Sequence, residues 1–412
     1  MDIKKLLSGI AIIIDDKIKK EDSQDLILNI RDKLKDNHVS ILEYEDLPDD
    51  SEIQNFNNIS FILLDWQLFE RPEPGMLMDE TLFINNNIKF LKDIREVSFT
   101  PVFIFSNQPP NSIIRKLSEE GIYNEGSNNY IFIKQKEDII SDVDDNLLFN
   151  EIENWLKETP SMYVLKEWEH SLNKTKRNLF WSFYEINPNW PSVLQKTFTD
   201  DGSDVNYELG NFIYKNLSAR AEQIIFDDNI LNREDDNISK QDIRKVLEAE
   251  RFIKNGALPD KPCTGDLFEC EDDVEESRKK KYYLNIRPDC DIAIQSGRTS
   301  NPNLYCLKGK IVDEEKIILC NNTQEEISIN NNNIIFKRGS FIEKVNNAYI
   351  SFVNDGKIIE FTFNDLKIKQ WKKLKNKRIG RLLPPYVTRV QQRYSSYLQR
   401  QGLPAIPKKA IK

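Results

Sequence analysis

The sequence is poor in histidine and lacks closely spaced cysteines. Its 412 residues include only two histidines, His38 and His170, and five cysteines, none of which forms a CxxC pair. Two imidazoles leave little material for a His-rich zinc site, and the odd number of cysteines in a chain of this size argues against a disulfide framework. Any chemistry must rest mainly on carboxylates, lysine, hydroxyls or one cysteine. This cysteine usage favours the cytoplasm.

Long apolar runs are also missing. No run reaches the roughly 18 residues that span a bilayer, so we expect no membrane partner. The apolar stretch Leu6 to Ile14 is followed at once by Asp15, Asp16 and Lys17. A signal peptide would have a small-residue cleavage site at that point. We therefore interpret the stretch as a buried strand.

Negative charge is absent from one part of the chain. The net charge is −9, yet residues 366–412 contain no Asp or Glu and 14 Lys or Arg. Such asymmetry predicts contact with an anionic surface. That surface could be nucleic acid, which would be bound through its phosphates, an acidic protein partner, or the acidic remainder of this chain. A basic face that is merely solvated is the simpler alternative.

The first 140 residues alternate short apolar runs with amphipathic segments. The amphipathic segments lie at about 22–36, 80–97 and 110–121, and the apolar runs are 10–14, 40–44, 59–64, 102–105 and 130–133. Near-continuous apolar strands separated by helices indicate a parallel sheet that is covered on both faces. The pattern predicts an α/β flavodoxin-like, doubly wound (βα)5 fold.

After residue 145 the periodicity of the apolar residues changes twice. Residues 146–256 show mainly helical periodicity, including a helix that opens at Ser239 and is expected to run to about Lys254. Residues 257–365 show strands without helices between them, among them a short strand at 316–319. We expect a small antiparallel β-barrel or sandwich there, with a hairpin at Asn354-Asp-Gly356. The basic tail, 366–412, carries a last helix that begins near Pro384-Pro385 and ends at Gly402. The predicted divisions are therefore 1–145, 146–256, 257–365 and 366–412.

Polar side chains follow four of the predicted strands. Ligands of a doubly wound sheet bind outside the carboxyl ends of its strands. The residues found there are Asp15 and Asp16 after the first run, Asp65 after the third, Ser106 after the fourth and Lys134 after the fifth. Crowded carboxylates repel one another, and a hard cation with oxygen ligands relieves that repulsion. Strands often end in polar loops, so any one of these residues alone indicates little. Only the full set, at the ends of four strands, indicates a site.

This set resembles the receiver domain of bacterial response regulators, of the CheY-like kind, over residues 6–140. The resemblance implies that Asp65 is the phosphoacceptor, and that Asp15, Asp16 and Asp65 hold Mg²⁺. It implies that Ser106 binds a phosphoryl oxygen and that Lys134 pairs with the phosphate or with Asp65. The expected partners are a sensor histidine kinase or another phosphodonor, and a protein partner of the output module.

The sequence departs from that family in three places. Ile131 stands three residues before Lys134, where receivers usually have an aromatic residue, and Tyr130 is displaced from that position by one. Gln135 follows Lys134 where receivers usually have proline, and the segment 66–75 after Asp65 is longer than usual. Two interpretations therefore remain, namely active phosphorylation and a phosphorylation-independent interaction domain. Three sequence segments resemble an uncharacterised "response receiver" branch found in bacterial conflict and antiphage modules. They are Gly265-Asp-Leu-Phe, Tyr283 to Asp291 and Leu382 to Tyr394.

The second half leaves an enzymatic alternative open. Cys290, beside Asp289 and Asp291, could act as a nucleophile in a receiver-gated enzyme, although a catalytic cysteine needs a base or positive surroundings. A structural cysteine is the simpler interpretation. Zinc is not expected, because the cysteines are spaced by 7, 20, 16 and 14 residues and lack close pairs.

Overall fold

The computed structural model describes residues 7–20, 25–68, 80–124, 129–140, 146–232, 239–271, 280–294, 300–312, 326–329, 332–335 and 346–400. The chain divides into two compact units. Unit 1 comprises Met1–Pro188 and Ile213–Glu234, and unit 2 comprises Asn189–Phe212 and Asp235–Lys412. Among the described residues, no helix combines the length and the apolar character that a membrane span requires.

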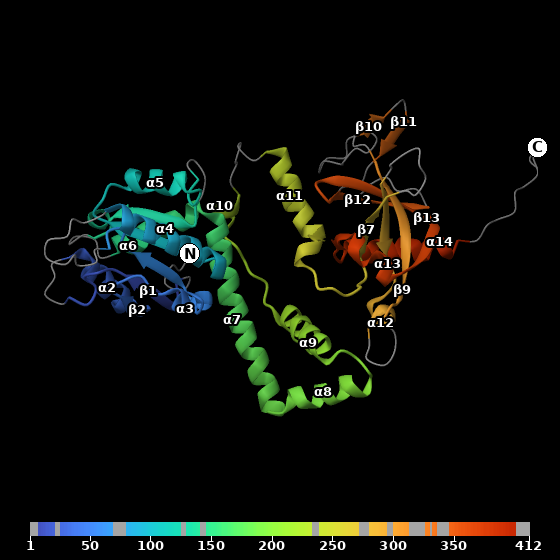
Figure 1. Cartoon of the computed structure of the whole chain (residues 1–412), viewed down its shortest axis with the longest axis horizontal. Coiled ribbons are helices and arrows are strands. Elements are labelled where there is room, and N and C mark those ends of the chain that lie inside the picture. Colours follow the sequence, from blue (N-terminus) through green and yellow to red (C-terminus); the bar gives the residue numbers. More distant parts are fainter. Residues whose placement is uncertain are drawn as a thin grey trace, which may run out of the picture. The chain divides into compact units, whose positions relative to one another are not determined.

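Unit 1 is built on five parallel strands. The strands are β1 (Ile10–Ile14), β2 (Ser40–Tyr44), β3 (Phe61–Leu64), β4 (Val102–Ser106) and β5 (Ile131–Gln135). Figure 1 labels β1 and β2 of this sheet. The order of the five strands across the sheet is β2-β1-β3-β4-β5. This order is that of flavodoxin-like folds. The predicted parallel α/β sheet is therefore confirmed.

Helices cover both faces of this sheet. They are α2 (Leu26–Asp36), α3 (Asp50–Ile53), α4 (Glu80–Val97), α5 (Pro110–Glu119), α6 (Leu147–Glu158) and α7 (Pro160–Ile186). Side chains of one strand alternate between the two faces: Ile13 enters the core formed with α2, α6 and α7, and Ile12 enters the core formed with α4 and α5. Burial on both faces explains why the strands read as continuous apolar runs.

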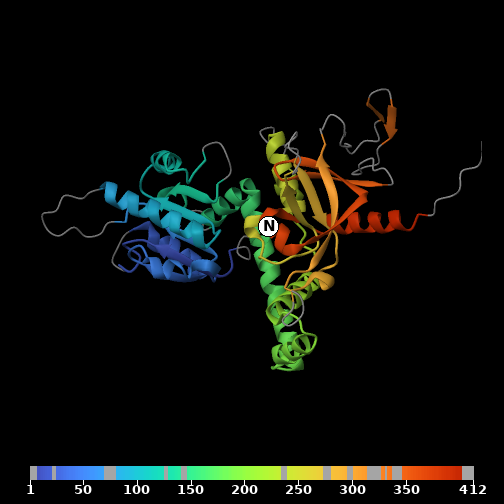
Figure 2. The same cartoon turned by 45° about the vertical axis from the view of Figure 1, so that its right-hand side comes forward.

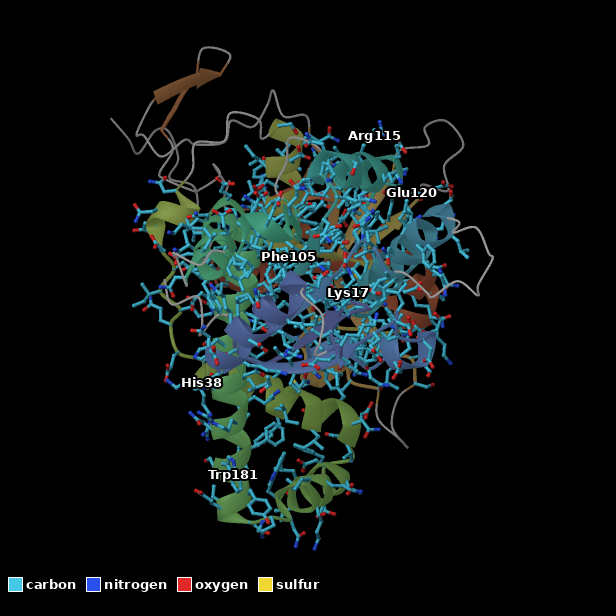
Figure 3. The ribbon with its side chains drawn as sticks, turned by 90° about the vertical axis from the view of Figure 1, so that its left-hand side faces the viewer. Lys17, His38, Phe105, Arg115, Glu120 and Trp181 are labelled. Atoms are coloured by element: carbon cyan, nitrogen blue, oxygen red, sulfur yellow. The ribbon has the colours of Figure 1, made fainter. Side chains whose placement is uncertain are left out.

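Helices α6 and α7 complete the first of these cores. Trp155 of α6 packs against the rings of Phe103 and Phe132, and Met162 and Tyr163 of α7 are buried in the same core. The predicted boundary at residue 145 lies outside the described residues and precedes both helices. Figure 3 labels Trp181, which is exposed on the part of α7 that extends beyond the sheet. Ile230 of the short α10 (Asp228–Leu231) joins this core again.

The helical segment continues with α8 (Trp190–Asp200), α9 (Val205–Arg220) and α11 (Lys240–Arg251). Ser239 caps α11, because its Oγ accepts a hydrogen bond from the backbone N of Asp242 at 3.1 Å. The sequence predicts that this helix runs to about Lys254, and that prediction is wrong. Residues Phe252–Lys254 instead form strand β6, which pairs with a strand from the C-terminal part of the chain.

Unit 2 contains one curled antiparallel sheet (Figure 2). Its order is β12-β13-β9-β8-β7-β14-β6. The bounds are β7 (Asp266–Cys270), β8 (Lys281–Asn285), β9 (Asn303–Ile311), β12 (Asn347–Val353), β13 (Lys357–Gln370) and β14 (Arg378–Leu382). A separate pair is formed by β10 (Glu326–Ile329) and β11 (Asn332–Ile335). The expected strand at 316–319 lies outside the described residues.

The predicted hairpin is confirmed between β12 and β13. Val353 pairs with Lys357, and the three residues between them all have positive φ angles: 49° at Asn354, 72° at Asp355 and 73° at Gly356. Asn, Asp and Gly tolerate this left-handed region better than other residues. The residues of this turn therefore determine the hairpin connection between β12 and β13.

Much of the predicted basic tail belongs to the sheet. Strand β14 lies between β7 and β6, and α13 (Trp371–Leu374) precedes it. The expected C-terminal helix is α14 (Tyr386–Leu398), and its Val387 and Val390 are buried in the core beneath the sheet. The basic stretch is thus an integral part of unit 2 as far as the structure describes it, up to residue 400.

Candidate functional site

Four aspartates and one lysine meet at the carboxyl end of the unit 1 sheet. Asp15 and Asp16 directly follow β1, and Asp65 directly follows β3. Asp25 is the N-cap of α2. Lys136 begins the 3-10 turn η2 (Lys136–Asp138), which directly follows β5. Three strand ends and one helix start thus contribute to a single cluster.

Lys136 is the centre of this cluster. Its Nζ lies 2.8 Å from Asp15 Oδ2, 2.9 Å from Asp65 Oδ2 and 3.0 Å from Asp25 Oδ1, and its side chain is completely buried. An ammonium group has three donors, so these three carboxylates use all of them. A buried charge with such partners is held in place because leaving it unpaired would be very costly.

Negative charge remains in excess around this lysine, and the pKa values reflect it. Burial raises the pKa of Asp15 to about 6, and the neighbouring Asp65 acts in the same direction, against the opposing effect of Lys136. Burial would lower the pKa of Lys136, but the fields of Asp65 and Asp15 outweigh it and hold that pKa above its usual range. The surplus charge would be neutralised by a cation.

The carboxylates fit a divalent cation with oxygen ligands. Asp15, Asp16 and Asp65 each offer an oxygen, and these three oxygens lie within 4.8 Å of one another. Asp16 Oδ1 is buried and has no hydrogen-bond partner among the described residues, whereas Asp16 Oδ2 accepts from Lys20 Nζ at 3.3 Å. An unpartnered buried carboxylate oxygen is costly in the absence of a ligand. The donor set is the kind that Mg²⁺ prefers.

The structure brings together most of the residues that the sequence nominated. Asp15, Asp16 and Asp65 form the cluster as expected. Asp65 Oδ1 accepts a hydrogen bond from the backbone N of Gln67 at 3.0 Å, which fixes its orientation. Ser106 is completely buried at the end of β4, the strand beside β3, and its Oγ accepts from the backbone N of Gln108 at 3.2 Å.

Lys134 does not reach the cluster, which corrects the sequence-based assignment. Its Nζ lies 2.8 Å from Glu151 Oε2 on α6 and 5.8 Å from the ring centre of Phe132. The reason is geometric: Lys134 is still part of the edge strand β5, and its side chain is directed toward α6. Lys136 comes after the strand has ended, where the turn lets its side chain reach back to Asp65.

Sequence reasoning missed Lys136 and Asp25. The sequence pattern favours Lys134, the lysine nearest the end of the apolar run, although a second lysine follows two residues later. Asp25 lies directly before α2, and an aspartate before an amphipathic run is a common N-cap signal. That signal would have identified Asp25 as a cap, but not as a partner of Lys136.

Unit 2 has a separate cavity of about 370 Å³. Asp289 lines it together with Tyr207, Lys261 and Cys263. Lys261 Nζ lies 3.0 Å from the ring centre of Tyr207. Cys290 is exposed and is not among the lining residues, and its Sγ contacts Asp291 Oδ1 at 3.6 Å. Burial raises the pKa of the Cys263 thiol, which disfavours its thiolate.

Comparisons with known proteins add little to this geometry. No protein-family model matches the sequence, and no curated protein matches it. A signal receiver domain of an HD domain-containing protein from Pseudomonas fluorescens Pf-5 is 12% identical with a TM-score of 0.23, covering 37% of this chain and 98% of that one. A yeast Spc42 coiled-coil segment fused to another structure is 14% identical with a TM-score of 0.24, covering 43% and 99%.

The sheet order β2-β1-β3-β4-β5 and the acidic cluster of Asp15, Asp16 and Asp65 fit a receiver fold.

Proposed function

We propose that unit 1 is a receiver-like signalling domain that accepts a phosphoryl group on Asp65 and holds Mg²⁺ through Asp15, Asp16 and Asp65. The observation that supports this most directly is the buried Lys136, which bridges Asp15 and Asp65 beside the unpartnered oxygen of Asp16. A purely structural ion pair would not require a third carboxylate with a buried free oxygen.

The chemistry follows from the positions of these groups. A carboxylate oxygen of Asp65 attacks the phosphorus of the donor, a new O–P bond forms, and the leaving group departs with the electron pair of the broken bond. When bound, Mg²⁺ would neutralise charge on the transferring phosphoryl group. Lys136 supplies a fixed positive charge at the same place, and Ser106 is the hydroxyl assigned to a phosphoryl oxygen. Attack of water on phosphorus returns Asp65 and inorganic phosphate.

The wider role is that of a response-regulator-like protein. The phosphodonor would be a sensor histidine kinase or a small phosphorylated molecule, and the output would be a protein interaction of the remaining chain. The proposed setting in a bacterial conflict or antiphage module rests on the segments near Gly265, Tyr283 and Leu382. In the structure these segments contribute to strands β7 and β8, to the last residue of β14 and to helix α14.

The test is phosphorylation of the whole chain by acetyl phosphate with and without Mg²⁺. We expect acid-labile, hydroxylamine-sensitive phosphate that requires Mg²⁺ and is absent from Asp65→Asn. Asp138→Asn, at the end of the same turn that Lys136 begins, is a matched aspartate control and should behave like the native chain. Absence of label with acetyl phosphate and with genomically neighbouring kinases, or equal label in Asp65→Asn, would reject the proposal and favour a phosphorylation-independent interaction domain.

A receiver-gated enzyme is the second candidate, and the unit 2 cavity is the observation that favours it. Asp289 accepts a hydrogen bond from the backbone N of Thr264 at 2.6 Å and lines the cavity beside Lys261 and Tyr207. If this cavity binds a substrate, Asp289→Asn should weaken binding of small polar compounds, as measured by thermal-shift screening. Asp291→Asn, which lies outside the cavity lining, is the control.

A further inference from the structure

One carboxylate of the cluster is left without a role by the receiver resemblance. Asp25 has a side chain that is only 7% exposed. Its Oδ1 accepts hydrogen bonds from the backbone N of Ile27 and from Lys136 Nζ, both at 3.0 Å, and its Oδ2 accepts from Lys17 Nζ at 2.9 Å. A single side chain therefore caps α2, holds Lys136 and holds Lys17. Figure 3 labels Lys17 within unit 1.

We propose that Asp25 is a positioning residue for the phosphoacceptor site, which holds part of the Lys136 ammonium and ties the state of Asp65 to the first turn of α2. This inference rests on the proposed function and adds a means of regulation to it. Asp25 touches neither the phosphoryl group nor the cation, and it acts through Lys136.

Lys136 and a bound cation would compete for the same carboxylate oxygens. Lys136 donates to Asp15, Asp25 and Asp65, and it has no fourth donor. If Asp25 were removed, the ammonium would be shared by Asp15 and Asp65 alone. These two residues are also cation ligands in the proposed site, so Lys136 would compete more strongly with Mg²⁺. Loss of one nearby negative charge weakens cation binding in the same direction.

Phosphorylation of Asp65 would change which oxygens Lys136 contacts. A phosphoryl group on Asp65 presents new charged oxygens that are strong acceptors. Because every donor of Lys136 is in use, a phosphoryl oxygen gains one only when a carboxylate gives one up. Asp25 is the carboxylate that can release Lys136 at least cost, since it keeps the hydrogen bonds from Lys17 Nζ and from the backbone N of Ile27. Phosphorylation therefore weakens the Asp25–Lys136 contact, and α2 is the helix that responds.

A simple capping role predicts different behaviour, and the chain offers a matched control. Asp49 caps α3 in the same unit, where its Oδ1 accepts from the backbone N of Ser51 and of Glu52, both at 2.9 Å, and it makes no contact with Lys136. Asparagine is as good an N-cap as aspartate. Asp25→Asn and Asp49→Asn thus both preserve the caps, and only the former removes a carboxylate from Lys136.

The first experiment measures access to Lys136 and needs no phosphorylation. The whole native chain and both variants are treated briefly with acetic anhydride, and acetylation of Lys136 is quantified by peptide mass spectrometry. We expect at least a threefold faster reaction in Asp25→Asn and no change in Asp49→Asn. Asp25→Glu, which retains the charge, should restore most of the protection and guards against a folding defect in Asp25→Asn. Equal protection of Lys136 in Asp25→Asn would overturn the proposal.

The second experiment measures Mg²⁺ affinity. Trp66 is buried and directly follows Asp65, so its fluorescence should report binding, and Trp66→Phe assigns the signal. We expect about tenfold weaker Mg²⁺ binding in Asp25→Asn and unchanged binding in Asp49→Asn. Unchanged affinity in Asp25→Asn would contradict the competition argument. If the native chain neither responds to Mg²⁺ nor forms an acyl phosphate, the proposed function fails, and the acetylation result alone decides whether Asp25 positions Lys136.

Discussion

Lys134 and Lys136 are two residues apart, yet their ammonium groups serve different parts of unit 1. Lys134 Nζ pairs with Glu151 on α6 at 2.8 Å, and Lys136 Nζ pairs with Asp65 at 2.9 Å. The side chain of Lys134 is 35% exposed, whereas the side chain of Lys136 is completely buried. This difference gives a direct test of which lysine belongs to the site.

Lys136→Met should destabilise unit 1 strongly, and Lys134→Met should not. Removing Lys136 leaves three buried carboxylates without their common counter-charge, which typically costs about 3–5 kcal/mol. Removing the partly exposed Lys134 should cost at most about 1 kcal/mol. Urea unfolding of the two variants measures both values. Added Mg²⁺ should recover part of the loss in Lys136→Met, because it supplies positive charge to the same carboxylates. Similar losses in the two variants would contradict the site described for Lys136.

Gly380→Ala should disrupt the sheet of unit 2. A Cβ at Gly380 would lie 2.2 Å from the ring of Phe252 and 2.3 Å from the carbonyl oxygen of Ile253, so β6 and β14 would have to separate. Overpacking of this kind costs about 1–3 kcal/mol. Gly256→Ala is the control, since a Cβ there meets nothing within 4 Å. A thermal melt in which both variants match the native chain would mean that β14 does not pair with β6 in solution.

Thiol labelling should distinguish the cysteines. Cys290 is exposed, whereas Cys263, Cys270 and Cys306 are buried. Burial raises the pKa of Cys306 to about 12, so at pH 8 only about one molecule in ten thousand carries its thiolate. Maleimide should therefore label the exposed Cys290 in the folded chain and leave Cys306 unlabelled. Peptide mass spectrometry after maleimide treatment measures this. Rapid labelling of Cys306 under native conditions would show that the sheet opens readily.

The basic stretch should bind nucleic acid weakly. Arg381 Nε lies 2.7 Å from Asp266 Oδ1, and Arg378 is buried beside the same carboxylate, so part of the positive charge is neutralised within unit 2. We expect weak binding of a short DNA and a short RNA at 150 mM salt, measured by fluorescence anisotropy. Tight, salt-sensitive binding that is lost when the exposed Lys372, Lys373 and Lys377 are changed together to glutamate would overturn this expectation.

The sequence alone indicated the five-strand parallel sheet of unit 1 and the three aspartates that gather at one end of it. Continuous apolar runs such as 102–105 indicated a sheet that is buried on both faces, and the polar residues that follow them indicated which end of the sheet carries the acidic cluster. Asp15, Asp16 and Asp65 could be named in advance because the carboxyl ends of parallel strands meet at one edge. The turn at Asn354 to Gly356 could be named because few residues adopt positive φ angles.

Only the tertiary structure decided which lysine and which fourth carboxylate complete the site. The choice between Lys134 and Lys136 depends on the residue at which β5 ends, and a shift of one or two residues there redirects a side chain from α6 to Asp65. Asp25 meets Lys136 across 111 residues of chain, a contact that no local pattern encodes. Likewise, β14 reads as part of a charged tail because its basic side chains obscure the strand pattern. The buried Asp266 and the close approach of β6 to Gly380 place it in the sheet, and both exist only once the chain has folded.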